Sequence, residues 1–177
     1  MYPRMKVELV ITNRLIDLIA EGIDVAIRAG GLKDSGLVAK RYGLGYFGLW
    51  ASPEYLNEHG TPRHPKELTA HKFLPFSRFN GGVRLTNGKE SVDVAPDGLL
   101  KADDFETLRG LAALGDGIAC LPSFLCGGKE KEKKLIRVLP QWHGEQVSLS
   151  LVYPAQKFVP AKVRAFIAVA DEILKRN

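Results

Sequence analysis

Apolar and polar residues alternate near the start of the chain, from Met5 to Ile11, and this period of two predicts a strand with one buried face. Thr12 and Asn13 follow, and either side chain can accept hydrogen bonds from the first N–H groups of a helix. That helix would bury Leu15, Leu18 and Ile19 and end at Gly22. A second strand is expected over residues 24–28. A strand that follows a strand and a crossover helix should lie parallel to the first.

The middle of the chain mixes strand and helix patterns. A short helix is expected over residues 66–70, and two strand segments at 82–85 and 91–94 flank Asn87-Gly88, a pair favoured in hairpin turns. A helix is predicted to begin at Asp103, which with Glu106 resembles a capping box. The last helix should start at Pro160, with Lys175 and Arg176 near the negative end of its dipole. Further strands are expected over residues 37–41, 46–51, 118–121, 135–139 and 147–153.

This order of elements predicts an α/β protein of two lobes, because helix-rich stretches flank a middle that contains the hairpin. We expect residues 1–75 and 148–177 to form lobe I and residues 76–147 to form lobe II. Lobe II holds 10 basic and 10 acidic residues, so the net charge of +5 belongs to the flanks, which hold 15 and 10. The difference in charge supports the division.

Composition narrows the class of protein further. The chain has 177 residues, of which 45% are hydrophobic and 25% charged, as in ordinary soluble globular proteins. Its apolar runs are shorter than the roughly 18 residues of a membrane span, so no membrane partner is expected. The first thirty residues lack the features of a secretory signal, and only two cysteines occur, which favours the cytoplasm.

No catalytic or metal-binding motif is found. Cys120 and Cys126 match no common zinc or redox spacing and are interpreted as core thiols. The run from Lys129 to Lys134 alternates in sign and indicates a solvated surface rather than a nucleic-acid patch. The four histidines lack partners at ligand spacing, and no nucleophile elbow, phosphate loop or dinucleotide motif is present. We therefore expect a protein that is not an enzyme and uses neither a cofactor nor a metal.

Six segments, in order along nearly the whole chain, resemble the effector-binding (substrate-binding) domain of LysR-type transcriptional regulators. The segments are Tyr2-Pro-Arg-Met-Lys-Val-Glu-Leu9, the stretch from Leu15 to Arg28, Leu37-Val-Ala-Lys-Arg41, Ala51-Ser-Pro-Glu-Tyr-Leu56, the stretch from Leu111 to Pro122, and Val159-Pro-Ala-Lys-Val-Arg-Ala-Phe166. The resemblance implies a two-lobed fold like that of type 2 periplasmic binding proteins, with three-layer α/β/α lobes joined by two crossover strands. A small-molecule effector would bind in the cleft between the lobes.

The resemblance also implies partners. Family members pair as dimers and bind DNA through a winged helix-turn-helix, which this sequence lacks together with the first strand and helix of lobe I. We interpret the sequence as a fragment of a longer regulator or a naturally shortened paralogue. Two other functions are a stand-alone solute-binding protein of the same fold, which the missing signal disfavours, and an enzyme using Cys120 or Asp103, for which no positioned base is found.

Candidate effector contacts follow from the strand ends and from the resemblance. Thr12 lies where helix N–H groups attract anions and where the family places a ligand-contacting hydroxyl, although capping alone would explain it. Asp103 could cap its helix or face the cleft and repel a carboxylate; the cap is favoured. Arg28 could bind an anion or pair with Asp34, and the surface pair is favoured. The full expected set is Thr12, Asn13, Gly30, Phe76, Ser77, Asp103 and Asp104, with a carboxylate among the expected effectors.

Overall fold

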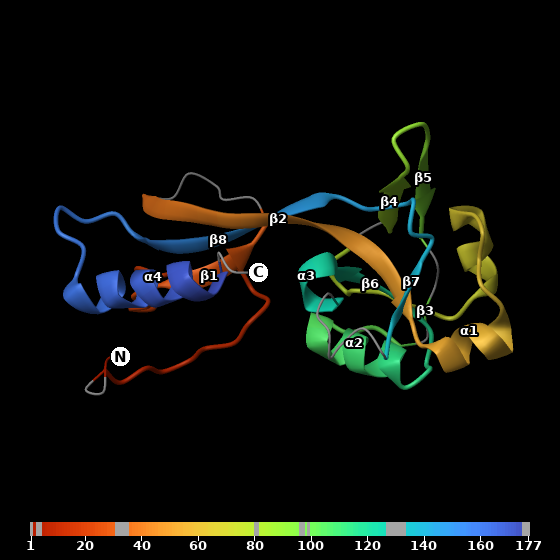
Figure 1. Cartoon of the computed structure of the whole chain (residues 1–177), viewed down its shortest axis with the longest axis horizontal. Coiled ribbons are helices and arrows are strands. Elements are labelled where there is room, and N and C mark those ends of the chain that lie inside the picture. The colour runs from red at the N-terminus through yellow and green to blue at the C-terminus, as the bar shows by residue number, and fades with distance from the viewer. Residues whose placement is uncertain are drawn as a thin grey trace. The chain divides into compact units, whose positions relative to one another are not determined.

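The computed structural model describes residues 2, 5–30, 36–79, 82–95, 98, 100–126 and 134–174. The chain divides into two compact units (Figure 1). Unit 1 comprises Met1–Leu44 and Val147–Asn177, and unit 2 comprises Gly45–Gln146. No helix of the described part is long and apolar enough to cross a bilayer.

Unit 1 is built on three strands and one long helix. Strand β8 (Gln146–Pro154) lies between β1 (Ala26–Ala29) and the first part of β2 (Leu37–Ala51), and it is antiparallel to β1. Helix α4 (Ala161–Leu174) is tied to β2 through Asp171, whose carboxylate accepts hydrogen bonds from Lys40 Nζ at 2.5 Å and Tyr42 Oη at 2.6 Å. The predicted final helix is confirmed, and Val163 and Ala170 are buried on it. Lys175 and Arg176 lie outside the described residues.

The predicted strand over Met5–Ile11 and the helix after it are wrong. This segment forms no strand, and Leu9 and Ile11 are 77% and 92% exposed. Among the described residues no strand pairs with it, and a strand without a partner leaves its backbone groups and apolar face in water. Residues 18–22 form a turn that buries Leu18, and the carboxylate of Asp17 accepts from the N–H groups of Ile19 and Ala20. Figure 1 draws this first segment as a plain trace.

Unit 2 is a three-layer α/β structure. Its sheet has the order β2, β6 (Ile118–Pro122), β3 (Phe73–Leu74), with β7 (Ile136–Val138) on the other side of β2. One face carries α1 (Pro53–His59) and the 3₁₀ helix η1 (Pro65–Ala70), and the other carries α2 (Phe105–Ala113) and α3 (Ser123–Cys126). Alternate β6 side chains serve the two faces: Ile118 and Cys120 join the first core, and Ala119 and Leu121 the second.

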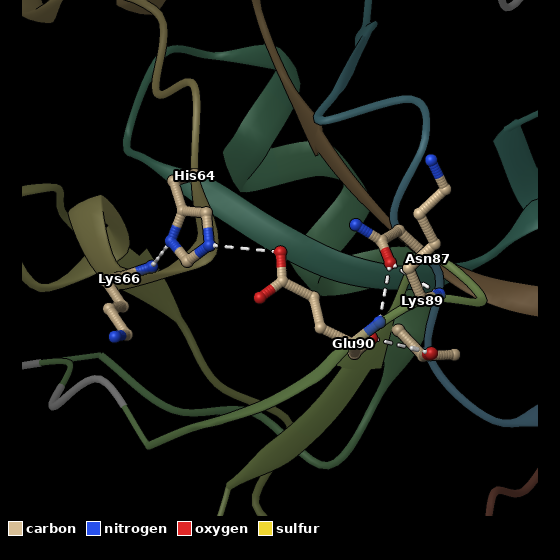
Figure 2. Close-up of polar contacts among 6 residues, drawn as sticks. His64, Lys66, Asn87, Lys89 and Glu90 are labelled. Carbon is tan, nitrogen blue, oxygen red and sulfur yellow. Dashed lines mark hydrogen bonds and ion pairs between the residues drawn. The ribbon is translucent and has the colours of Figure 1, made fainter.

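The predicted hairpin is confirmed. Strands β4 (Val83–Thr86) and β5 (Ser91–Val94) are antiparallel, and Thr86 pairs with Ser91 across a four-residue loop. The Asn87 side chain accepts from the N–H groups of Lys89 and Glu90 at 2.9 and 3.0 Å and so holds the loop (Figure 2). Glu90 also faces His64, whose Nε2 lies 3.7 Å from its carboxylate (Figure 2). This contact connects the hairpin to the residue that caps η1.

The chain passes from unit 1 into unit 2 at a position that differs from the expected lobe boundary between residues 75 and 76. Residues 37–41 and 46–51, expected as separate strands, form the single strand β2, and the chain enters unit 2 within it, between Leu44 and Gly45. Phe47–Trp50 pair with β6, and Phe73 and Leu74 pair with β6 in parallel, which places both segments in unit 2. The return to unit 1 falls between Gln146 and Val147.

Candidate functional site

The carboxyl end of β3 meets the segment that leads into α2, and this junction gathers four of the seven expected contact residues. Phe76 and Ala102 form a parallel bridge, and the N–H of Ser77 donates to the carbonyl of Ala102 at 2.9 Å. Phe76 is 7% exposed, whereas the side chain of Ser77 is exposed. Ligands of α/β sheets bind outside the carboxyl ends of strands, so this end of unit 2 is the candidate site.

The start of α2 differs from the expectation by one residue. Asp104, not Asp103, is the N-cap: its carboxylate accepts from the Thr107 N–H at 2.6 Å and from the Thr107 hydroxyl at 2.7 Å. Asp103 is exposed and lies 4.0 Å from a guanidinium nitrogen of Arg78. The pattern of Asp103 and Glu106 resembled a capping box, but the cap is Asp104, and both donors to its carboxylate come from Thr107. The positive end of α2 is therefore already occupied by a carboxylate.

Four phenylalanine rings surround this junction. Phe76 and Phe105 stack with ring centres 4.0 Å apart and an interplanar angle of 16°. Phe79 meets Phe76 edge-on at 5.2 Å and Phe47 at 5.1 Å, and Phe47 lies 5.7 Å from Phe105. Phe76 is buried and the other three are half-buried. We call these four residues the phenylalanine cluster. Sequence reasoning found only Phe76, since rings from distant positions meet here only through the tertiary fold.

The expected contacts in unit 1 lie on turns rather than at a helix start. The Thr12 hydroxyl accepts from the Arg14 N–H at 3.1 Å, and both Thr12 and Asn13 are exposed. Gly30, with φ of 108°, follows β1 and exchanges hydrogen bonds with Ser148, whose hydroxyl donates to its carbonyl at 2.9 Å. Arg28 donates to the carbonyl of Ile16, and Asp34, its expected partner, lies outside the described residues.

A pocket of about 460 Å³ lies at the other end of the unit 2 strands. Its lining runs from Thr69 to Leu74 and includes Gly98, Leu100 and Asp116. Lys72 and Asp116 precede β3 and β6, so the pocket lies at the amino ends of these parallel strands. None of the seven expected contact residues lines it.

Arg137 on β7 is the most unusual side chain of unit 2. Its guanidinium lies across Gly48, between the rings of Tyr46 and Trp50 at 4.8 and 5.3 Å, and donates to the carbonyl of Trp142 at 2.6 Å. Burial lowers its pKa. A Cβ on residue 48 would lie 1.5 Å from the Arg137 Nη1 atom, so a side chain at position 48 would require the guanidinium or the strand to move. No sequence pattern indicated this arginine.

Both cysteines are buried free thiols, as interpreted from the sequence. Burial raises the pKa of the Cys120 thiol to about 12, which keeps it protonated and unreactive at neutral pH. Among the described residues no group of histidine, cysteine and carboxylate side chains could hold a metal ion.

Comparisons with known proteins show the family to which this fold belongs. The LysR substrate binding domain family matches residues 1–175. The HTH-type transcriptional regulator CrgA of Neisseria meningitidis serogroup C (strain 8013) is 36% identical over 180 residues, which cover 99% of this chain and 60% of that protein. The chain thus spans less than two thirds of the length of this relative.

Solved structures give the same result. The regulatory domain of CrgA, a LysR-type transcriptional regulator from Neisseria meningitidis, matches with a TM-score of 0.84 and 35% identity over 98% of this chain and 86% of that domain. The full-length Vibrio cholerae virulence activator AphB matches with a TM-score of 0.80 and 31% identity, covering 94% of this chain and 58% of AphB.

The chain belongs to the LysR substrate binding domain family, the effector-binding part of LysR-type transcriptional regulators. The predicted fold class is confirmed by the likeness to LysR regulatory domains. These relatives are transcription regulators rather than enzymes, and the solute-binding alternative gains no support from them.

Proposed function

We propose that this chain is the sensor of a transcription regulator, and that binding of a small-molecule effector changes its conformation. The single observation that carries the proposal is the likeness to the CrgA regulatory domain over 98% of the chain. In the whole protein, an effector that binds one conformation better than another would shift the population of conformations and so reposition DNA-binding domains.

In unit 2, we propose that the effector contacts the junction of β3 and α2, through Phe76, Ser77 and Asp103. Ser77 supports this role because its backbone N–H is fixed by Ala102 while the residue is exposed. A side chain held on a rigid strand end can bind a ligand without a large cost of ordering. Asp104 instead positions α2, since its carboxylate is engaged by Thr107. Thr12, Asn13 and Gly30 stay predicted contacts in unit 1.

Two of the cations at this junction already have carboxylate neighbours: Arg78 lies beside Asp103, and Arg109 pairs with Glu106 at 2.7 Å. We propose that a carboxylate effector binds mainly through the unit 1 residues. We further propose that the regulator acts in the cytoplasm as a dimer and reaches DNA only through a domain outside this sequence.

A thermal-shift panel on the purified chain tests the proposal. Neutral, cationic and anionic metabolites are added at millimolar concentration. We expect at least one of them to raise the Tm in a saturable way. A ligand at one hundred times its Kd stabilises the folded state by roughly 2.7 kcal/mol. Ser77→Trp should abolish the rise by filling the site. Ser91→Trp, an exposed serine on β5, is the control and should retain it. A rise that survives in Ser77→Trp contradicts the proposed site.

A further inference from the structure

The phenylalanine cluster presents partly open aromatic rings at the point where the proposed effector binds. Its members come from β2, from the segment after β3 and from the first residue of α2, so the surface is held by three separate parts of unit 2. Aromatic rings favour stacked or edge-on partners over aliphatic ones of the same size. Phe79 and Phe105 remain half-buried after packing against each other at 6.4 Å.

Charge at the same junction is balanced. The sequence around it holds three basic residues, Arg78, Lys101 and Arg109, and three acidic residues, Asp103, Asp104 and Glu106. Arg78 lies beside Asp103, and Arg109 pairs with Glu106. Asp104 counters the positive end of the α2 dipole. An anionic group of a ligand at the helix start would therefore meet carboxylates, and two of the three basic residues already have carboxylate neighbours.

From these two observations we propose that the effector carries an uncharged aromatic ring that packs against the phenylalanine cluster, with a hydroxyl or similar polar group directed at Ser77. This inference rests on the proposed function and names the chemical class of its ligand. Ser77 is an exposed residue whose hydroxyl can donate and accept, and the Asp103 carboxylate can accept from a ligand hydroxyl. A phenol-like group therefore satisfies both the apolar surface and the polar edge.

The test compares three simple probes on the whole chain: phenol, cyclohexanol and benzoate. Amide resonances of Ser77 and Thr107 are followed by NMR during each titration. We expect phenol to shift both amides with an affinity about 3- to 10-fold above that of cyclohexanol, because of these two probes only phenol has an aromatic ring. Benzoate should be weaker than phenol, since its charge faces Asp103 and Asp104.

Two matched variants separate the cluster from general apolar contact. Phe105→Leu keeps an apolar side chain but removes a ring, and it should lower the affinity for phenol about 3-fold or more. Phe124→Leu removes a more exposed ring from α3, outside the cluster, and should leave the affinity unchanged. Equal affinities for phenol and cyclohexanol, or no effect of Phe105→Leu in a folded protein, would overturn the inference.

The outcomes also distinguish the inference from the proposed function. If cyclohexanol or benzoate shifts the Ser77 and Thr107 amides and phenol does not, the junction binds ligands but the aromatic class is wrong. If none of the probes moves these amides and a compound from the metabolite panel shifts resonances elsewhere, both the class and the proposed site are wrong.

Discussion

Gly48 leaves the space that the Arg137 guanidinium occupies, so Gly48→Ala should destabilise unit 2. The added Cβ would lie 1.5 Å from Arg137 Nη1 and 2.3 Å from Cζ, closer than any non-bonded contact allows. Either β2 shifts or the arginine leaves its position between Tyr46 and Trp50 and loses the bond to the Trp142 carbonyl. Overpacking costs roughly 1–3 kcal/mol if the strand shifts, and loss of a charged hydrogen bond costs about 1.5–3 kcal/mol if the arginine leaves, so we expect a loss of about 1–3 kcal/mol.

Urea unfolding followed by tryptophan fluorescence measures this loss, because both tryptophans, Trp50 and Trp142, lie in unit 2. Gly43→Ala is the matched control on the same strand, since a Cβ there would meet nothing within 4 Å. Arg137→Ala in the Gly48→Ala background should recover part of the loss, which a double-mutant cycle reports. A free energy of unfolding for Gly48→Ala equal to that of Gly43→Ala would refute the packing described for Arg137.

Three further predictions concern other parts of the chain. Asp104→Ala should cost about 1 kcal/mol by removing the α2 cap, while Asp103→Ala should cost less than about 0.5, as thermal unfolding of the two variants will show; the reverse order would restore Asp103 as the cap. Burial lowers the pKa of His71 from its ordinary value of 6.5, so the unfolded chain binds more protons and stability should fall as the pH drops through that value. His71→Gln should show a smaller fall between about pH 7.5 and 5.5 in urea midpoints, and equal falls would contradict this. The exposed apolar residues of the first segment, among them Leu9 and Ile11, should drive self-association that Ile11→Glu weakens; sedimentation with only a 19.5 kDa species at high concentration would count against it.

Local patterns predicted the elements whose stabilising contacts are near in sequence. The hairpin follows from Asn87-Gly88 and its flanking alternation, and α4 follows from its apolar face. Helix α1 was missed although Ser52, which caps it at 3.1 Å through the Tyr55 N–H, and Pro53 at its first position are both start signals.

The first segment shows the limit of local pattern. Residues 5–11 alternate as a strand should. Alternation indicates only which face of a strand would be buried, and not whether a neighbouring strand exists to pair with it. No described strand pairs with them, and the pattern alone could not reveal that. The same limit applies to β2, where two predicted strands are one, because pairing with β6, β7 and β8 carries the strand through Gly43 and Gly45.

The sequence predicted where in the fold the candidate site lies, but not which side chains form its surface. The order of strand and helix located Phe76, Ser77 and the start of α2, since strand ends precede helix starts in α/β folds. The phenylalanine cluster depends on Phe47 and Phe79 coming together with Phe105, and the cap depends on Thr107 rather than Glu106. The cluster is a consequence of tertiary packing, which residue spacing does not encode, whereas the cap is a local contact that the spacing of Asp104 and Thr107 also allowed.

The central claim is tested most directly by a crystal structure of the chain bound to the compound that gives the largest rise in Tm. The account predicts that the compound lies against Phe76, Phe105 and the Ser77 hydroxyl, at the carboxyl end of β3. A compound bound instead in the pocket beside Lys72 and Asp116, at the amino end of the same strand, would contradict it.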